Sequence, residues 1–388
     1  MNRATRFRLT IPARINILGN PADGNEGAHA TISAAIDTYS GATIEPAEGV
    51  VLEEVTRTGT LLARQEYSGS PPYPYDGVVD LEKGAFNRLH AYSAEFRQRL
   101  ADWGGVRVRV WTDVPRHSGL GGSSLPVLLT LTGLRALYQL DPLYHNNYVL
   151  AEMCQRVEAM DLGIVCGYAD RYVPLFGGLA YVDYHGKVRQ RPLGEEPFAT
   201  YERLDGYVAD PPLVIAFTGL AGDSGDVHGC MRPLYLQAYD AHQRGAPKPF
   251  LVDVMERAWI TAWQGKMVLL RGDWAEVGRL MGENHRLVHR MMMHCGLPGG
   301  AGPANNALID AALEAGALGA KLTGAGGRGS VFALTRPGEE DVVLEAMQRT
   351  IAREGMVGAC AWHAHVDHEG LRLQPESIAE ETVCSASC

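Results

Sequence analysis

Apolar residues recur along the chain in two spacings, one typical of strands and one typical of helices. Strict alternation in 106–114 (VRVRVWTDV) and β-branched residues in 7–18 and 40–47 predict strands. The apolar stretch 213–219 predicts a buried strand, and 319–335 predicts a strand, a glycine turn and a second strand. Strands are therefore expected in both halves of the chain.

Helical spacing occupies much of the sequence between these strands. Apolar residues three and four positions apart form one face of a helix, and that face packs on a core. Six segments show this pattern, at 84–101, 125–140, 146–160, 251–270, 273–290 and 304–316. Predicted helices and strands are therefore interspersed along the chain.

The length of 388 residues favours two domains, because a single core rarely grows beyond about 300 residues. The segment 191–212 is polar, has prolines near both ends and predicts the junction. We therefore expect domains at 1–200 and 201–375. The small polar residues of 376–388 predict a disordered tail.

Composition excludes several classes of function. The net charge of −10 argues against nucleic-acid or anionic-membrane partners. The N-terminal residues are charged where a signal peptide would be apolar, and no uncharged run approaches a membrane span, so we expect a cytoplasmic protein. The seven cysteines are scattered and lack paired CxxC spacing, which argues against structural zinc and a disulfide framework.

The most informative segment is 115–124 (PRHSGLGGSS), directly before an apolar helical stretch. Glycines free the backbone N–H groups of this loop, and a helix N-terminus adds a positive dipole, so the junction can bind a phosphate. Ser123 and Ser124 stand where their hydroxyls could reach a metal ion, although the lysine of a Walker A loop is absent. The alternative is an ordinary strand-to-helix turn with serine as N-cap. The loop alone leaves both interpretations open.

Two other glycine-bearing segments carry polar candidates. In 13–27 (ARINILGNPADGNEG), Arg14 could face a phosphate or a carboxylate, and Asn20 and Asp23 could bind substrate hydroxyls. The alternative is a strand with an exposed arginine followed by a plain turn. The glycines of 323–330 (TGAGGRGS) could let the backbone approach a ligand, although a hairpin turn is the commoner explanation.

Asp170 follows a glycine turn and precedes an aromatic stretch. The adjacent Arg171 favours its ionised form, and such a carboxylate suits the proton acceptor or hydroxyl-orienting group of phosphoryl transfer. The alternative is a surface ion pair between the two residues.

The order of these segments resembles the GHMP kinase superfamily, small-molecule kinases that include galactokinase, homoserine kinase and mevalonate kinase. The resemblance spans about 10–335 and is greatest to glucuronokinase-like sugar kinases, through 13–23, 160–171, 176–184 and 222–228. It implies an α+β protein with a two-domain fold, in which an N-terminal ribosomal-S5-like domain and a C-terminal ferredoxin-like domain hold the active site between them. It also implies ATP and Mg²⁺.

The resemblance assigns roles to individual residues. The ATP phosphates would be bound by Pro115, Gly119, Leu120, Gly121, Gly122, Ser123 and Ser124, with Gly324, Gly326 and Gly327 closing over them. Ser124, with Ser123 as second choice, and Glu158, with Asp161 as second choice, would coordinate magnesium. Asp170 would be the catalytic carboxylate, kept ionised by Arg14.

The implied substrate is a small hydroxylated molecule, and we expect the anomeric hydroxyl of a uronic acid such as glucuronate. The expected substrate contacts are Asn20, Asp23, Tyr168, Arg171, Ser224 and His228. A uronate needs a cation, for which the candidates are Arg116, Arg171, Arg232 and His228, although a solvated surface charge is the commoner explanation for each of them. Another sugar, a non-sugar alcohol such as mevalonate, and a non-catalytic homologue stay open, as do a monomer and a homodimer.

Overall fold

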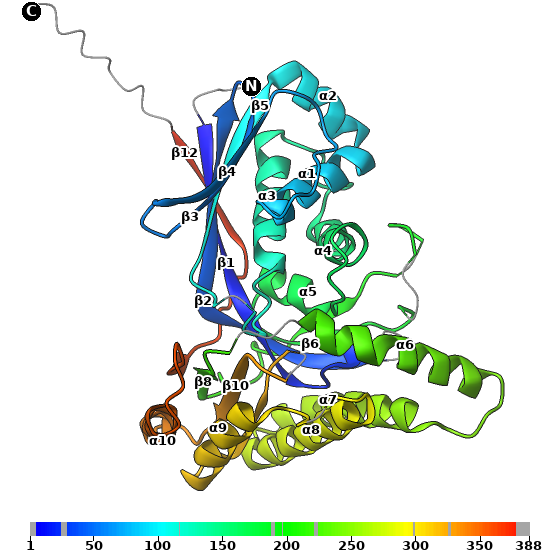
Figure 1. The fold of residues 1–388 in the computed structure, drawn as a ribbon, viewed down its shortest axis with the longest axis vertical. Coiled ribbons are helices and arrows are strands. Elements are labelled where there is room, and N and C mark those ends of the chain that lie inside the picture. The colour runs from blue at the N-terminus through cyan, green and yellow to red at the C-terminus, as the bar shows by residue number, and fades with distance from the viewer. Residues whose placement is uncertain are drawn as a thin grey trace, which may run out of the picture.

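The computed structural model describes residues 5–24, 29–115, 117–187, 191–195, 197–220, 224–297, 299–324 and 327–377. Within these residues the chain forms two sheets, each with its own group of helices (Figure 1). The larger sheet and its helices occupy one end of the molecule, and the smaller sheet with α7 to α10 occupies the other. The α+β expectation is confirmed.

The larger sheet has eight strands, in the order β12-β1-β2-β5-β3-β4, with β6 pairing with β2 and β7 pairing with β6. Its strands are β1 (Thr5–Leu18), β2 (Ala30–Ala47), β3 (Val50–Val55), β4 (Leu61–Tyr67), β5 (Gly105–Thr112), β6 (Leu179–Asp183), β7 (Thr200–Arg203) and β12 (Arg372–Ser377). In β5 the alternation seen in the sequence places Val106, Val108 and Val110 in the core. The three strands predicted in this half are confirmed.

Five helices lie on one face of this sheet (Figure 1). They are α1 (Asp80–Tyr92), α2 (Ala94–Trp103), α3 (Ser124–Leu137), α4 (Asn147–Arg156) and α5 (Ala169–Phe176). The single helix predicted at 84–101 is wrong. The chain breaks at Ser93, which is extended and accepts a hydrogen bond from the Phe96 N–H, so it caps α2.

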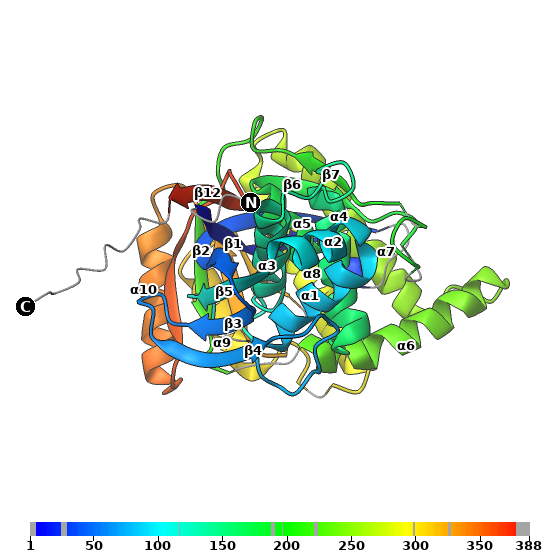
Figure 2. The same ribbon diagram turned by 90° about the horizontal axis from the view of Figure 1, so that it is seen from above.

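The smaller sheet is antiparallel, in the order β11-β8-β10-β9. Its strands are β8 (Leu213–Phe217), β9 (Gly319–Leu322), β10 (Ser330–Leu334) and β11 (Cys360–Ala364). The helices of this half are α6 (Ser224–Gln243), α7 (Phe250–Leu269), α8 (Trp274–His294), α9 (Pro303–Glu314) and α10 (Glu340–Arg353). Part of α6 projects from the body of the molecule, as the view from above shows (Figure 2).

The chain crosses between the two halves more than once. Strand β7 lies inside the segment predicted as the junction, and it pairs with β6 of the larger sheet. Strand β12 returns from the C-terminal half to pair with β1, so that Thr5 lies opposite Ser377. The residues at which two domains divide therefore stay a prediction. In the part of the chain that is described, no helix is long and apolar enough to cross a membrane.

Candidate active site

A cleft of about 860 Å³ lies where the predicted segments meet. It is lined by Arg14, Asp23, Gly119, Gly121, Gly122, Ser123, Asp170, His228 and Gly324, together with side chains of β3, β4, β5 and α1. Segments that are more than 300 residues apart in the sequence, β1 and the turn after β9, thus face the same space. We treat this cleft as the candidate active site.

Arg14 and Asp170 form an ion pair at the centre of the cleft. Arg14 is almost fully buried on β1, and its Nε lies 2.7 Å from Oδ1 of Asp170, in the first turn of α5. Its Nη2 contacts the same oxygen, and its Nη1 donates to the carbonyl of Gly119. Burial would raise the pKa of Asp170, but the charges of Arg14 and Arg171 outweigh it and lower that pKa. Arg14, rather than the adjacent Arg171, bonds the carboxylate.

Ser123 and Ser124 both donate to one buried carboxylate. Ser123 occupies the N-cap position of α3, but its side chain forms no capping hydrogen bond with the helix. Instead, the Ser123 hydroxyl lies 2.6 Å from Oε1 of Glu158 and the Ser124 hydroxyl lies 2.8 Å from its Oε2. Glu158 reaches them from a π-helical turn (Val157–Asp161) that follows α4, and its side chain is fully buried. The two hydroxyls and the carboxylate form one oxygen cluster.

Arg171, Tyr168 and Asp161 were also expected at the site, but they contact other side chains and do not line the cleft. Arg171 is fully buried, pairs with Glu158 and donates to the Gly167 carbonyl. Tyr168 is also fully buried, with the Lys187 ammonium 4.5 Å from its ring centre. Asp161, the second choice for magnesium, accepts a hydrogen bond of 3.0 Å from Arg88. The surface ion pair considered for Asp170 and Arg171 is wrong, because each pairs with a buried partner.

The phosphate loop needs its glycines. Gly119 and Gly121 have φ of 74° and 84°, a region that side chains with a Cβ rarely adopt. A Cβ on Gly119 would lie 2.9 Å from the carbonyl oxygen of Thr323, so the loop of the C-terminal half approaches closely here. The backbone of Leu120 accepts from the Arg14 N–H, and the Leu120 side chain is buried in the core. Pro115 precedes the loop and does not line the cleft.

The second glycine loop meets the first at Gly324. This residue lines the cleft, and a Cβ on it would lie 2.9 Å from the Gly119 carbonyl oxygen. Gly327 does not line the cleft and packs near Met292. Gly326 lies outside the described residues, as do Arg116 and the side chain of Ser224.

Asn20 bridges the two halves of the chain. Its side chain is fully buried, its Oδ1 accepts from the Lys321 ammonium at 2.5 Å, and its Nδ2 donates to the Gly324 carbonyl at 3.1 Å. Lys321 also donates to the carbonyls of Asn16 and Leu322, at 3.0 and 2.9 Å. Sequence reasoning missed Lys321, whose only signal was a lysine inside an apolar strand. Asn20 does not line the cleft.

Asp23 and His228 lie together at the end of the cleft beyond Asp170. Oδ2 of Asp23 accepts from the Ala169 N–H at 3.2 Å, and a Cβ on Gly167 would lie 2.1 Å from that oxygen, so a side chain there would displace the carboxylate. Burial and the charge of Asp170 raise the pKa of Asp23. Burial lowers the pKa of His228 to about 4, so this imidazole is neutral at pH 7.

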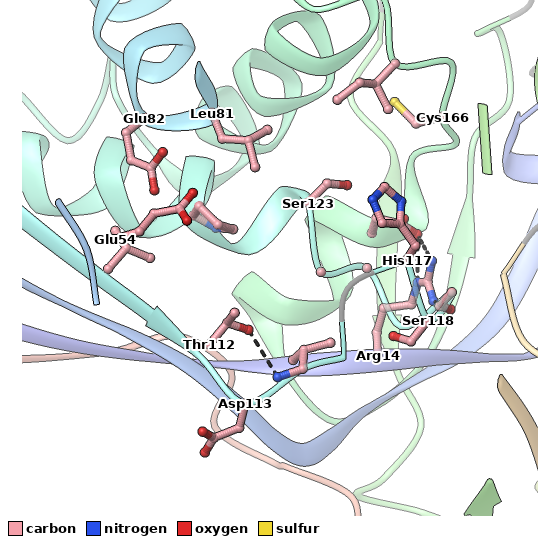
Figure 3. A pocket seen from close by; sticks show the side chains of 18 of the residues that line it. Arg14, Glu54, Leu81, Glu82, Thr112, Asp113, His117, Ser118, Ser123 and Cys166 are labelled. Atoms are coloured by element: carbon pink, nitrogen blue, oxygen red, sulfur yellow. Dashed lines mark hydrogen bonds and ion pairs between the residues drawn. The ribbon is translucent and has the colours of Figure 1, made fainter. Parts of the chain in front are cut away.

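The opposite end of the cleft includes a group of apolar side chains that sequence reasoning missed. They are Val55, Leu62, Val79, Leu81, Trp111 and Pro126, and the charged side chains of Glu54, Arg57, Asp80, Glu82 and Asp113 line the cleft beside them. Figure 3 shows Ser123 near the middle of the view, with Arg14 and His117 on one side and Leu81 on the other. These apolar residues come from β3, β4 and β5, from the start of α1 and from α3, so no single stretch of sequence signals them.

Comparison with known proteins identifies both halves of the chain. The family model described as "GHMP kinases N terminal domain" matches residues 83–178, and the one described as "GHMP kinases C terminal" matches 267–353. Glucuronokinase 1 of Arabidopsis thaliana is 28% identical over 350 residues, which cover 87% of this chain and 88% of that protein. A D-glycero-alpha-D-manno-heptose 7-phosphate kinase of Campylobacter jejuni is 23% identical, over 88% of this chain and 93% of that protein.

Solved structures share the fold over nearly the whole chain. The galactokinase of Lactococcus lactis, complexed with galactose, superimposes with a TM-score of 0.71 at 17% identity and covers 95% of both chains. A D-glycero-D-manno-heptose 1-phosphate kinase from Bacteriodes thetaiotaomicron gives a TM-score of 0.66 at 20% identity, over 95% of this chain and 98% of that one. Both domain matches and the shared two-domain fold agree with the motifs around the cleft, and the chain belongs to the GHMP kinases.

Proposed function

We propose that this enzyme transfers the γ-phosphoryl group of ATP to a hydroxyl of a sugar. The observation that carries the proposal is the Arg14–Asp170 pair beside the glycine loop at the start of α3, all within one cleft. Phosphoryl transfer requires an aligned hydroxyl, a cradle for the phosphates and neutralisation of their charge. Relatives named as glucuronokinase and heptose phosphate kinase support a sugar as the acceptor.

Asp170 accepts or orients the proton of the attacking hydroxyl. Both hydrogen bonds from Arg14 reach Oδ1, and among the described residues no donor reaches Oδ2, which leaves that oxygen for the substrate. The lowered pKa keeps the carboxylate ionised at neutral pH, as a proton acceptor requires. Arg14 holds this carboxylate in place and adds positive charge where the transferred phosphoryl group gains negative charge.

The glycine loop holds the phosphates of ATP. Its positive-φ glycines point backbone N–H groups outward, and the dipole of the 14-residue helix α3 adds positive potential at the same place. Arg14 fixes the loop through the Gly119 carbonyl. The apolar end of the cleft, with Leu62, Leu81 and Trp111, accommodates the base.

The cluster of Ser123, Ser124 and Glu158 fits a magnesium ion. Mg²⁺ prefers hard oxygen ligands and is usually held by one or two carboxylates together with phosphate oxygens and water. Two hydroxyl oxygens at the end of the phosphate loop, where α3 begins, and one carboxylate supply that donor set. A bound magnesium ion would neutralise phosphate charge here. Arg171 orients Glu158, because it pairs with Oε2 of that carboxylate.

Glucuronate is the proposed substrate on the strength of the relatives, and a neutral sugar is the second candidate. Among the described residues that line the cleft, the arginine and lysine side chains are those of Arg14 and Arg57. Arg14 is paired with Asp170 and Arg57 with Asp113. The uronate carboxylate therefore has no unpaired cation in the described wall, an observation that favours the neutral sugar.

Release of ADP tests the proposal directly. The purified protein is incubated with Mg-ATP and, in separate reactions, glucuronate, galacturonate, glucose, galactose, fucose, a manno-heptose, mevalonate and homoserine. The proposal predicts ADP formation that depends on a sugar. Turnover with mevalonate or homoserine alone would assign a different acceptor, and sugar binding without ADP would indicate a non-catalytic homologue.

A further inference from the structure

His228 lies in the active-site cleft, yet phosphoryl transfer as described leaves it without a role. It stands on the second turn of α6 and lines the cleft with Asp23, Gly167 and Asp170. Only 6% of its surface is exposed. Neither ring nitrogen forms a hydrogen bond with any described residue, and Nδ1 is buried without a partner. A buried imidazole without partners is rare in a folded protein, because an unmade hydrogen bond costs stability.

The position of the ring is fixed by packing rather than by hydrogen bonds. The ring lies against Gly24, where a Cβ would approach its Cε1 to 2.6 Å. One turn further along α6, Arg232 donates to the Gly24 carbonyl at 2.7 Å and fastens the helix to the same turn. A Cβ on Gly24 would be 2.8 Å from Nδ1 and 3.6 Å from Nε2. Nε2 is therefore the nitrogen farther from this turn and more open to the cleft.

The charges around the ring favour a hydroxyl over an anion. Two carboxylates, Asp23 and Asp170, share this wall, and a substrate carboxylate beside them would be repelled. A hydroxyl can donate to Asp23 and accept from an imidazole N–H at the same time. The ring is neutral because burial lowers its pKa to about 4, and the nearby Arg232, Arg171 and Arg14 also disfavour a proton.

We propose that His228 is a specificity-determining residue that hydrogen-bonds, through Nε2, a substrate hydroxyl other than the one phosphorylated. The substrate turns its hydroxyl edge toward Asp23 and His228, and any carboxylate that it carries points away from them. This inference rests on the proposed sugar kinase function and specifies how that site orients its acceptor.

The test pairs variants of His228 with deoxy sugars. For the sugar that the enzyme phosphorylates best, His228→Leu is expected to raise KM about 10-fold and to leave kcat little changed. A 10-fold change in KM corresponds to the loss of about one neutral hydrogen bond. His228→Gln, whose amide reaches as far as Nε2, is expected to keep most of the affinity, whereas His228→Asn, whose amide reaches only as far as Nδ1, is not. With the one monodeoxy sugar that lacks the bound hydroxyl, His228→Leu and the unchanged enzyme should have the same KM.

A matched control is His29, which does not line the cleft. Burial also lowers the pKa of His29 to about 4, but its Nε2 has a partner, the Tyr235 hydroxyl at 2.9 Å. His29→Leu should lower thermal stability without changing the order of KM among the deoxy sugars. An unchanged KM in all three His228 variants, or an equal rise for every deoxy sugar, would show that the ring only packs against Gly24. If the unchanged enzyme forms no ADP with any sugar, the proposed function fails and this inference with it.

Discussion

Two regions of the active site, the phosphate end at Ser123, Ser124 and Glu158 and the sugar end at Asp23 and His228, differ in how far the chain satisfies its own polar groups. At the phosphate end, Glu158 accepts from Ser123, Ser124 and Arg171, and all its oxygens are engaged. At the sugar end, Asp23 accepts one backbone N–H and His228 has no described partner. The phosphate end is therefore organised before any ligand binds, whereas the sugar end holds hydrogen-bonding capacity for a substrate. Asp170 stands between them, with one oxygen bonded by Arg14.

Replacement of Asp170 gives the largest expected effect, because this residue joins the two ends. Asp170→Asn should lower kcat by about 10²–10⁴-fold, the range for a positioned proton acceptor. The initial rate of ADP formation measures it. Asp161→Asn is the matched control, since Asp161 also pairs with an arginine but does not line the cleft. Equal rates in Asp170→Asn and the unchanged enzyme would remove Asp170 from the mechanism.

The second largest expected effect is a difference in stability between a variant at the phosphate end and a variant at the sugar end. Glu158→Gln should lower the free energy of unfolding by about 3 kcal/mol, because Arg171 is left as a buried charge without its partner. The same variant should need more magnesium for half-maximal activity. Asp23→Asn, at the sugar end, leaves no buried cation behind and should cost about 1 kcal/mol or less while raising the sugar KM. Urea denaturation of both variants measures these changes. An equal loss of unfolding free energy in the two variants would contradict the distinction between the two ends.

Lys321 and Asn20 bridge the two halves of the chain, and the loss of this bridge should weaken the binding of ATP and of the sugar together. Lys321→Met leaves the carbonyls of Asn16 and Leu322 and the Asn20 side chain without this donor, and should cost about 2 kcal/mol of stability. Because Asn20 also holds Gly324, KM should rise for ATP and for the sugar alike. Lys187→Met is the control, since Lys187 is equally buried but pairs with Glu152 outside the cleft. A rise in only one of the two KM values would contradict a shared bridge.

The smallest expected effect is the pH dependence of stability that comes from the Asp170 carboxylate. The pKa of Asp170 is below its ordinary value of 3.8, so its ionised form stabilises the folded protein at neutral pH. That contribution is complete above 3.8 and is lost as the pH falls through the folded-state pKa. The difference in unfolding free energy between the unchanged protein and Asp170→Asn should stay constant from about pH 8 to 5 and shrink below 3.8. A change near pH 6.5 would indicate a histidine instead.

Much of the fold and of the active site could be predicted from local motifs and their order in the sequence. The glycine loop, Arg14 and Asp170 could be predicted to meet, because each lies in a short segment whose residue types and order are distinctive. The strand at 106–114 and the helix at 125–140 could be predicted from periodicity alone. The break at Ser93 could not, since one capping hydrogen bond outweighs a continuous apolar pattern.

The partners of the charged residues could not be read from the sequence. Arg171 follows Asp170 directly, yet successive residues on a helix point in different directions, and Arg171 reaches Glu158 instead. Asn20 was expected at the substrate, but Lys321, about 300 positions away, uses its side chain. The role inferred for His228 depends on the docking of α6 against Gly24, a contact that no local pattern encodes.

The most direct test of the account is to identify what the enzyme makes from ATP at the Asp170 site. Phosphorus NMR would follow Mg-ATP and the best acceptor sugar with the unchanged enzyme and with Asp170→Asn. Transfer through Asp170 should give ADP and a sugar phosphate in equal amounts from the unchanged enzyme, and should form both about 10²–10⁴-fold more slowly in the variant. Inorganic phosphate without sugar phosphate, or the same product at the same rate from Asp170→Asn, would contradict it.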